Sequence, residues 1–418
     1  MKWFSNSLPE SWRIRKLKRV TTLRYGDSLA VDDREEGDIA VYGSNGIVGS
    51  HNVTNQMGPG LIVGRKGSYG KVTYTTDPAF VIDTAYGIDS RGSRNDLRWL
   101  YYSLSSSTID QKMRDSPVPG LASRDAYGID FPLPPLPEQK RIAAYLDASC
   151  AVIDRAVETK QKQLETLDAL RKSIIQKAVT HGLNPNVEMK DSGVEWLGPI
   201  PNHWKVQKLK RVFSKVDYGI SQSTEQEGIY AVLKMGNIVK GEIAFTKIEF
   251  VPDVTPDLIL EKDDLLFNRT NSLDQVAKVA IFRGNRTDNV TYASYLVRLR
   301  TNHKNCPSYL NYLANADIFL GLARKMAIPS VQQANLNPTR YCRLGIPVPP
   351  LSEQIEIASF IDMRAEQICK IKQILNEQIA TLTAYRKSLI HECVTGKRRI
   401  SDADVSAVQH GRLDAQAQ

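Results

Sequence analysis

The sequence predicts an α/β (α+β) protein: two domains of mixed strands and short helices, separated by two long helices that form an antiparallel coiled coil. The segment 131–180 recurs without a gap as 346–395, and about 20 of its 50 positions are identical. Neither copy contains Gly or Pro for about 40 residues after its first turn. Short β-type runs separated by glycine turns precede each copy. One design of domain followed by helix is therefore present twice.

The first domain is expected to span residues 1–135 and the second 200–350. Each opens on a related phrase, LPESWRIRKLKRV from Leu8 and IPNHWKVQKLKRV from Ile200. The first domain is expected to contain strands at Ile39–Tyr42, Ile47–Val48, Gly60–Gly64, Lys71–Thr75 and Ala79–Ile82, and a helix at Leu97–Ser106. The second is expected to contain strands at Ile229–Leu233, Ile243–Phe250, Asp264–Phe267, Val276–Phe282 and Ala293–Arg300, and a helix at Ser308–Phe319.

The two long helices are expected at 136–181 and 351–395. Prolines precede each start, and Glu138 and Glu353 lie where the positive end of a helix favours a carboxylate. At 1.5 Å per residue each helix would be about 65 Å long. Apolar residues recur at heptad spacing, which predicts a seam buried against another helix. The seam includes Leu146, Ile153, Leu164, Leu167, Arg171, Ile174, Ile361, Ile368, Ile379, Leu382, Arg386 and Leu389.

Two matching seams in one chain favour pairing within the chain, although a coiled coil between two chains is the alternative that heptads alone allow. Arg171 and Arg386, each within an Arg-Lys-Ser sequence, are either contacts to a partner subunit or packed aliphatic stems whose charged ends reach water. A polar linker is expected at 182–199 and a polar, mobile tail at 396–418.

The composition indicates a soluble protein that can bury sizeable cores. Its formal charge of +9 permits nucleic-acid binding without demonstrating it. Five scattered cysteines form no CxxC pair, which is typical of reduced thiols in a cytoplasmic protein. No apolar leader and no run of 18 apolar residues occurs, so we expect neither secretion nor a membrane span.

These features together resemble the DNA-specificity subunit of type I restriction–modification systems. The phrases that carry the resemblance are PLPPLPEQKRIAAYLD, LRKSIIQKAVTHGL, MKDSGVEWLGPIPNHWKVQKLKR, PVPPLSEQIEIASFID and YRKSLIHECVTGK. The resemblance implies two target-recognition domains that each read one half of a bipartite sequence in double-stranded DNA. It also implies an antiparallel coiled coil that sets the gap and docks two modification (methyltransferase) subunits. The modification subunits would bind S-adenosylmethionine, and associated restriction subunits would use ATP and Mg²⁺.

The chain itself is expected to have no catalytic residues, metal site or cofactor. Its Asn-Pro pairs, Asn184-Pro185 and Asn337-Pro338, lack the Pro-aromatic continuation of an adenine methyltransferase motif. The glycine-rich run Gly64–Lys71 lacks phosphate-loop spacing, and the six histidines lack metal-ligand spacing. A non-catalytic subunit of a DNA methyltransferase or type I restriction complex is therefore predicted.

DNA contacts are expected in a loop after an apolar strand of each domain. Arg and Asn can read base edges bidentately, while Lys and Ser more often contact phosphates. The candidates are Ser44, Asn45, Arg65, Lys66, Ser68, Tyr69 and Lys71 in the first domain and Asn268, Arg269, Thr270, Asn271 and Ser272 in the second. For each residue, the alternative is an ordinary solvated loop.

Two other functions remain open at this point. One is a coiled-coil adaptor protein without DNA specificity, and the other is a DNA-cleaving enzyme with an unrecognised centre. The in-chain repeat argues against the adaptor, and the absence of clustered Asp, Glu, His and Lys residues argues against the nuclease.

Overall fold

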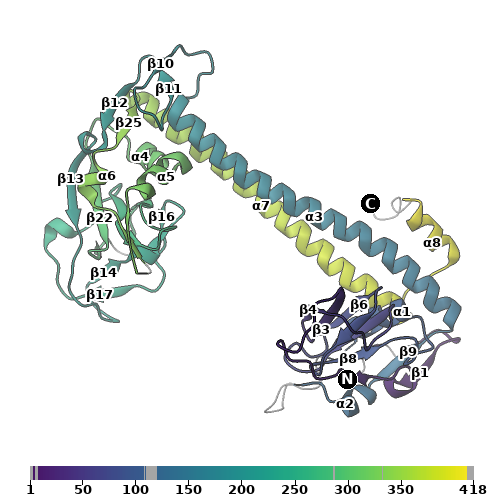
Figure 1. Cartoon of the computed structure of the whole chain (residues 1–418). Helices are drawn as coiled ribbons and strands as arrows, with labels where there is room; N and C mark the ends of the chain where they lie inside the picture. The colour runs from purple at the N-terminus through teal and green to yellow at the C-terminus, as the bar shows by residue number, and fades with distance from the viewer. Residues whose placement is uncertain are drawn as a thin grey trace. The chain divides into compact units, whose positions relative to one another are not determined.

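The computed structural model describes residues 3–4, 8–107, 109, 120–285, 288–331 and 333–411. The chain divides into two compact units, each of which contains one of the sheet-rich domains. Unit 1 comprises Met1–Gln161 together with Leu375–Gln418, and unit 2 comprises Lys162–Ile374. Each boundary therefore falls inside a long helix, so each unit contains part of both helices (Figure 1).

The domain of unit 1 is built on a four-stranded antiparallel sheet in the order β2-β8-β5-β6. A second sheet has the order β4-β3-β7, in which β3 pairs antiparallel with β4 and parallel with β7. The elements are β1 (Arg13–Lys16), β2 (Arg24–Tyr25), β3 (Ile39–Gly43), β4 (Gly46–His51), β5 (Gly60–Gly64), β6 (Val72–Thr75), β7 (Ala79–Val81), β8 (Ala85–Ile88), α1 (Leu97–Ser106), α2 (Ser123–Tyr127) and β9 (Asp130–Leu133).

The domain of unit 2 repeats this plan in a longer version. Its larger sheet has the order β13-β22-β18-β20-β16-β15, and its second sheet has the order β17-β14-β21. The strands are β10 (Met189–Asp191), β11 (Pro199–Pro201), β12 (Lys205–Lys208), β13 (Phe213–Tyr218), β14 (Tyr230–Leu233), β15 (Ile238–Val239), β16 (Glu242–Ile243), β17 (Glu249–Val251), β18 (Leu265–Asn268), β19 (Thr270–Asn271), β20 (Val279–Ile281), β21 (Val290–Tyr292), β22 (Leu296–Thr301), β23 (Ile328–Ser330), β24 (Gln333–Asn335) and β25 (Gly345–Val348). The helices are α4 (Pro307–Asn315), α5 (Asp317–Lys325) and α6 (Pro338–Tyr341).

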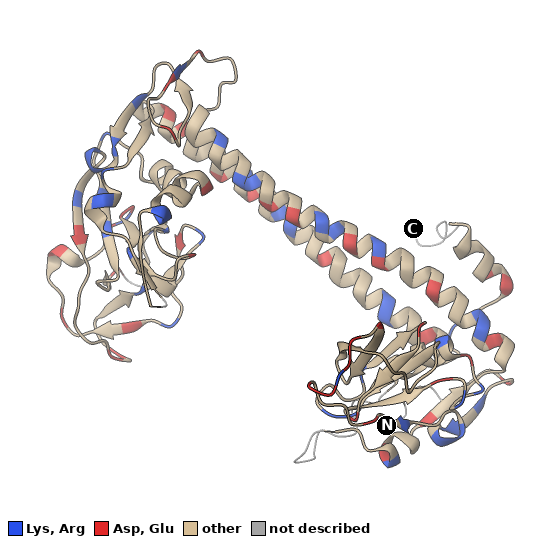
Figure 2. Ribbon diagram, viewed as in Figure 1, with Lys and Arg blue, Asp and Glu red and all other residues tan. Residues whose placement is uncertain are grey.

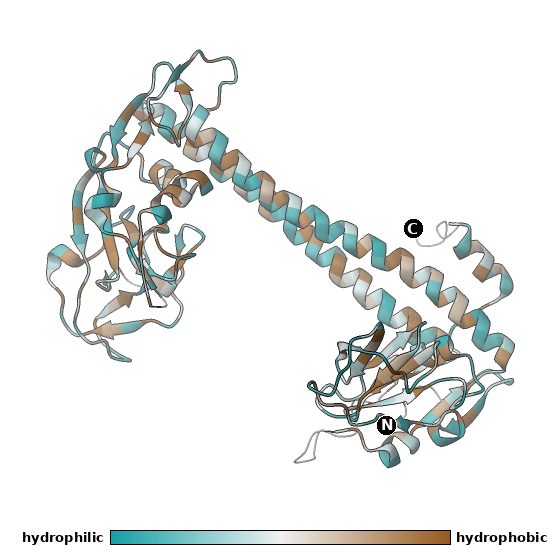
Figure 3. Cartoon of the chain, viewed as in Figure 1, coloured by the Kyte–Doolittle hydropathy of each residue, from teal (hydrophilic) through white to brown (hydrophobic). Residues whose placement is uncertain are grey.

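The duplication inferred from sequence is confirmed strand by strand. The order β2-β8-β5-β6 in unit 1 corresponds to β13-β22-β18-β20 in unit 2. The parallel pair β3–β7 corresponds to β14–β21, and β1–β9 corresponds to β12–β25. Each main sheet contributes apolar strand residues to the core of its unit, and the helices contribute more of them, so that apolar residues occur along strands and helices alike (Figure 3).

Three predicted elements of the second domain differ from the structure. The single helix expected at Ser308–Phe319 is two helices, because Ala316 between them has an extended backbone (φ −63°, ψ 133°). The strand expected at Ile243–Phe250 is interrupted, with Lys247 between its parts at φ 52°. Ala277, at φ 69°, likewise shortens the strand expected from Val276. None of these breaks lies at a Gly or Pro, so the sequence carried no signal for them.

The long helices are α3 (Leu136–His181) and α7 (Leu351–Val394), and they lie side by side within each unit (Figure 1). In unit 1, Arg386 donates to Asp154 at 2.8 Å, and Lys160 donates to Gln378 at 2.7 Å. Residue numbers thus fall along one helix as they rise along the other, which is an antiparallel register. In unit 2, Lys372 donates to Asp168 at 2.7 Å in the same register.

The predicted seam coincides with the buried side of this helix pair. Every predicted seam residue is buried or half-buried, whereas most of their neighbours along the helices are exposed. Basic and acidic residues are interspersed along both helices (Figure 2). The predicted pairing within one chain is therefore confirmed.

A buried glutamine joins each domain to the start of its following helix. Gln139 of α3 accepts from the Asp96 N–H at 2.9 Å and donates to the Asn95 side chain and to the Pro134 carbonyl. Gln354 of α7 makes the same three contacts, accepting from the Cys306 N–H at 2.8 Å and donating to Asn305 and Pro349. Gln139 thus holds the start of α1, and Gln354 holds the start of α4.

The end of each long helix is also covered in a repeated way. A left-handed glycine follows each helix, Gly182 at φ 77° and Gly396 at φ 75°. A side chain at either position would meet a tryptophan, Trp204 at 3.2 Å or Trp12 at 3.4 Å. The C-terminal tail in unit 1 therefore occupies the place that the linker between α3 and the second domain occupies in unit 2.

The tail differs from the mobile polar segment that the sequence predicts. It contains helix α8 (Asp402–Gln409), which is capped by Ser401. Ile400 and Val408 are each 4% exposed and belong to the core cluster of unit 1. Arg399 pairs with the buried Glu138 at 3.4 Å. Two apolar residues spaced eight apart in a short polar stretch were too weak a pattern to predict this docking.

Substituting Ile400 with alanine is expected to destabilise unit 1 by about 2 kcal/mol, because it removes a buried side chain and leaves a cavity. Thermal unfolding of the full chain would measure this loss. The exposed Gln409, changed to alanine, is the matched control within the same tail. Equal stability of Ile400→Ala and Gln409→Ala would show that the tail does not contribute to the core.

The carboxylate of Asp89 is fully buried at the end of β8 and gives the domain of unit 1 an acid-sensitive contact. It accepts from Arg24 and Arg91 at 2.6 Å and from the Met57 N–H at 3.2 Å. Burial alone would raise its pKa, but the bonds from Arg91 and Met57 and the charge of Arg24 outweigh burial and lower it.

A lowered folded-state pKa means that Asp89 stabilises the protein above its unfolded pKa of about 3.9, and that this contribution is lost as the pH falls through the folded value. Asp89→Asn is therefore expected to lower the melting temperature at pH 7 but to flatten its fall below about pH 4. The exposed Asp32→Asn is the control. Parallel melting curves for Asp89→Asn and the unaltered chain across this range would contradict the assignment.

No helix among the residues that the structure describes is long and apolar enough to cross a membrane. All five cysteines are free thiols.

Candidate nucleic-acid interface

The structure fixes Arg65 at the point where β5 ends. Its N–H donates to the Thr84 carbonyl at 2.8 Å, and its carbonyl accepts from the Leu121 N–H at 2.7 Å. The backbone is thus held from both sides by segments distant in sequence. This clamp fixes where the arginine side chain leaves the sheet.

The Arg65 guanidinium lies over an exposed aromatic ring. Its central carbon is 4.9 Å from the centre of the Tyr25 ring, and its Nη1 donates to the Asp83 carbonyl at 3.0 Å. Tyr25 is 56% exposed and packs edge-on against the buried Tyr86. Hydrogen bonds to Ser123 and Tyr86, followed by the Arg65 charge, lower the pKa of Tyr25. Together Arg65 and Tyr25 present a cation and an aromatic face at the surface.

Unit 2 contains the same arrangement at the equivalent place. Arg269 follows β18, its N–H donates to the Tyr295 carbonyl at 3.1 Å, and its carbonyl accepts from the Leu336 N–H at 2.8 Å. Its guanidinium lies 5.2 Å from the centre of the Tyr218 ring, which is 48% exposed. We call Arg65 with Tyr25, and Arg269 with Tyr218, the Arg–Tyr pairs.

A glycine places each tyrosine beside its arginine. Gly26 and Gly219 follow the tyrosines, and a side chain at either position would lie 2.1 Å from a carbonyl oxygen, of Ile82 or Tyr292. Only glycine permits the chain to pass this close to the neighbouring strand. The candidate list from sequence contained both arginines but neither tyrosine. The signal that could have identified them is the Tyr-Gly dipeptide that follows the repeated Leu-Lys-Arg-Val phrase in both domains.

The remaining candidates of the first domain lie in the β5–β6 loop that contains Arg65 or in the β3–β4 turn, and they differ in exposure and in their partners. Lys66 is exposed and pairs with Asp83 at 2.9 Å. Lys71 donates to the backbone and side-chain oxygens of Asn45, which joins the β5–β6 loop to the β3–β4 turn. Ser44, in that turn, lies next to the loop glycines, Ser68 is exposed and Tyr69 packs partly against the core.

An open groove of about 540 Å³ borders the β3–β4 turn and the β5–β6 loop. Its lining includes Asn45 and Lys71 from the loops and Arg98 and Tyr101 from α1. The Arg98 guanidinium lies 4.6 Å from the centre of the Tyr74 ring and pairs with Asp147 at 2.6 Å. The loops that carry Asn45 and Lys71 therefore adjoin a polar and aromatic surface formed by Arg98 and Tyr101 of α1.

The candidates of the second domain are more buried than those of the first domain are. Asn268 is only 1% exposed and its amide donates inward to the Gln275 carbonyl, so its side chain does not face solvent as the sequence led us to expect. It is the last residue of the fully buried strand β18, which extends one residue farther than predicted.

Thr270 and Asn271 form β19, which pairs with β24, and Thr270 is largely buried. Ser272 lies beyond β19 and donates to Asp274 at 2.6 Å. Arg269 is therefore the member of this group best placed for external contact.

The two seam arginines have different partners. Arg386 is held by Asp154 in unit 1. Arg171 lines a pocket beside α4 in unit 2. Among the residues that the structure describes, no group of three or more His, Cys, Asp or Glu side chains could hold a metal ion.

The arrangement defines a chain with two equivalent surface sites, each on a domain attached to a shared helix pair. A chain from a structure of a type I restriction–modification system has the same fold, with a TM-score of 0.68, 17% identity and coverage of 94% of this chain and 100% of that chain.

The profile of the type I restriction modification DNA specificity domain matches residues 9–167 and 201–381. The chain therefore belongs to the type I restriction–modification DNA-specificity family. It is 25% identical over 329 residues to the MjaVIII specificity subunit of Methanocaldococcus jannaschii, covering 76% of this chain and 74% of that protein.

It is also 28% identical over 205 residues to the putative MjaX specificity subunit of the same organism, covering 48% of this chain. That match spans 47% of the length of the relative. The two matches to the family profile, one per domain, support bipartite recognition and give no support to the adaptor alternative.

Proposed function

We propose that this chain is the DNA-specificity subunit of a type I restriction–modification complex, in which each domain reads one half of a bipartite double-stranded target. The observation that carries the proposal is the pair of equivalent Arg–Tyr surfaces. An arginine can bond two acceptors of a guanine, and an exposed ring can contact a base or a sugar. Two such sites on diverged domains suit two different half-sites.

The chain acts as a non-catalytic subunit in this proposal. Two modification subunits would dock on it, bind S-adenosylmethionine and methylate adenine, one per half-site. Because a base inside a duplex is out of reach of an active site, each modification subunit would flip its target base outward. Restriction subunits would bring ATP and Mg²⁺, and the complex would act in the cytoplasm.

The paired helices would set the gap between half-sites. Half-sites one turn of DNA apart are roughly 34 Å apart, which suits helices of this kind as a spacer. Inserting or deleting whole heptads in both helices should change the tolerated gap while preserving each half-site. An unchanged gap would contradict the spacer role.

The proposal is tested by mapping methylated adenines with single-molecule sequencing after co-expression of this chain with its modification subunit. A bipartite motif with a fixed gap is the expected result. Replacing residues 4–131 with the corresponding domain of a relative should change one half of the motif and leave the other unchanged. A well-folded complex that methylates a continuous motif, or none, would contradict the proposal.

A further inference from the structure

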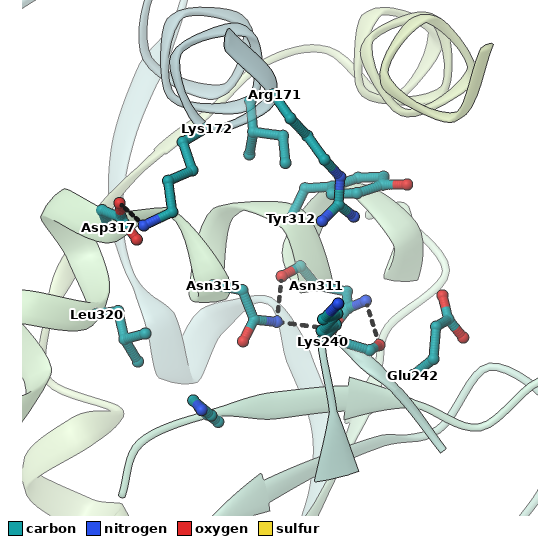
Figure 4. Close-up of a pocket in the computed structure, with 12 residues that line it drawn as sticks. Arg171, Lys172, Lys240, Glu242, Asn311, Tyr312, Asn315, Asp317 and Leu320 are labelled. Atoms are coloured by element: carbon teal, nitrogen blue, oxygen red, sulfur yellow. Dashed lines mark hydrogen bonds and ion pairs between the residues drawn. The ribbon is translucent and has the colours of Figure 1, made fainter. Parts of the chain in front are cut away.

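Unit 2 contains a pocket of about 290 Å³ enclosed by α3, the β15–β16 turn and α4. Its lining carries four cationic residues, Arg171, Lys172, Lys240 and Lys278. Two carboxylates, Glu242 and Asp317, also line it. Figure 4 shows Arg171 and Lys172 extending into it from the helix, opposite Lys240. The pocket lies apart from the Arg269–Tyr218 pair, whose residues do not line it.

Not all of these charges are free. Lys172 pairs with Asp317 at 3.0 Å, so these two opposite charges neutralise each other in the lining of the pocket. Glu242 is an exposed residue of β16, and desolvation of its carboxylate raises its pKa. Lys278 donates to the Gln275 side chain at 2.6 Å. Arg171 and Lys240 remain as cations on facing walls of the pocket, and within the described part of the chain neither has a carboxylate within 4.0 Å.

The internal duplication shows why Arg171 is unpaired. Arg171 of α3 corresponds to Arg386 of α7, which is held by Asp154 at 2.8 Å across the helix pair. The residue of α7 that corresponds to Asp154 is Cys369, and the register of the Lys372–Asp168 contact places it opposite Arg171. Arg171 therefore lacks the kind of partner that Arg386 has, because α7 has Cys369 at the position where α3 has Asp154.

The wall opposite Arg171 is rigid. Lys240 and Gly241 form a left-handed turn, at φ 52° and 87°, and the Gly241 carbonyl accepts from the Asn311 side chain at 2.8 Å. Asn315 donates to the Asn311 carbonyl and to the Val279 carbonyl, which joins α4 to β20. Lys240 is thus presented on a turn that side chains of α4 hold in place, so a ligand would bind with little rearrangement.

From this geometry we propose that the pocket binds a phosphate group between Arg171 and Lys240. A phosphate is negatively charged and has several acceptor oxygens. It can therefore accept charge-assisted hydrogen bonds from cations on two opposite walls at once. The volume admits a phosphate with a small attached group, so the phosphate could come from a backbone position of bound DNA or from a free phosphate compound. Only the DNA source rests on the proposed function.

The sharpest test restores the missing carboxylate. Cys369→Asp would give Arg171 the partner that Arg386 has, on an exposed helix position where folding is not at risk. Binding of inorganic pyrophosphate to the full chain, followed by phosphorus NMR and calorimetry, should weaken about tenfold in Cys369→Asp and in Lys240→Gln. The exposed Gln367→Asp adds the same charge to the same helix and is expected to leave pyrophosphate binding unchanged.

A second arm identifies the source of the phosphate. If the pocket holds a DNA phosphate, the slope of log K against log salt for target DNA should fall in magnitude by about 1 in Cys369→Asp but not in Gln367→Asp. If Cys369→Asp weakens pyrophosphate binding but leaves the salt dependence of DNA binding unchanged, the pocket binds a free phosphate compound. Absence of pyrophosphate binding by the unaltered chain, or equal binding by Cys369→Asp and Gln367→Asp, would overturn the proposal even if sequence-specific DNA recognition is intact.

Discussion

Arg65→Ala should remove discrimination in one half of the DNA target and leave the other half fully recognised, and Arg269→Ala should do the reverse. Each arginine is clamped through its backbone N–H and carbonyl and lies over a tyrosine ring at an equivalent position of its domain. Loss of a bidentate arginine contact to a base costs about 1–3 kcal/mol, or roughly 5- to 150-fold in affinity for the correct base.

The measurement compares binding of the assembled methyltransferase to three DNAs: the full target, and targets altered in either half. Arg65→Ala should bind the full target and the DNA altered in its own half equally weakly, while it still rejects alteration of the other half. Lys66→Gln is the matched control, since its exposed amine pairs with Asp83. It should weaken binding to all three DNAs alike, as loss of a phosphate contact does.

Tyr25 allows a finer comparison within the same site. Tyr25→Phe keeps the ring under the Arg65 guanidinium and should retain discrimination, whereas Tyr25→Ala should lose it. Equal behaviour of these two variants, or equal effects of Arg65→Ala on both half-sites, would contradict the assigned role of the pair.

Gln354→Leu should destabilise unit 2 by roughly 3 kcal/mol or more. The substitution leaves the Cys306 N–H, the Asn305 side chain and the Pro349 carbonyl without their partner. Each buried polar group that loses its partner costs about 1–3 kcal/mol. For a unit of this size the melting temperature should fall by roughly 6–12 °C. Leucine fills a similar volume, so the loss would come from the missing hydrogen bonds.

Gln139→Leu is the corresponding change in unit 1 and should have a comparable effect there, since its three contacts are the same. The exposed Gln367→Leu, on the same helix as Gln354, is the control and should change the melting temperature little. A melting temperature of Gln354→Leu within about 1 °C of this control would show that the glutamine does not hold the domain to its helix.

The sequence was most informative where one local pattern decides the structure. Every seam residue that the heptad spacing predicts on α3 and α7 is buried or half-buried, because burial along a helix pair repeats with a fixed period. Most strands of the first domain were predicted for a similar reason, since glycine turns bound short apolar runs. The sequence does not predict the break at Ala316, because neither Gly nor Pro marks it.

The candidate site was predicted only in part for the same physical reason. A charged residue after an apolar strand is visible in sequence, so Arg65 and Arg269 were expected. Their aromatic partners come from strands about 40 to 50 residues earlier, and only the folded sheets bring Tyr25 and Tyr218 beside them. Asn268 has the same chemistry as a surface reader, but strand β18 continues through it and buries its side chain.

Unit 1 is assembled from both ends of the chain, and this affects how the protein is made. Residues 162–374 are contiguous, so unit 2 can complete its contacts while the ribosome is still translating the remainder. The first domain leaves the ribosome before unit 2, yet the half of α7 that it packs against, and Ile400 and Val408 of the tail, are translated after unit 2. The apolar surface of the first domain is therefore covered only after unit 2 has been translated, and the domain made earlier is the one that completes its core later.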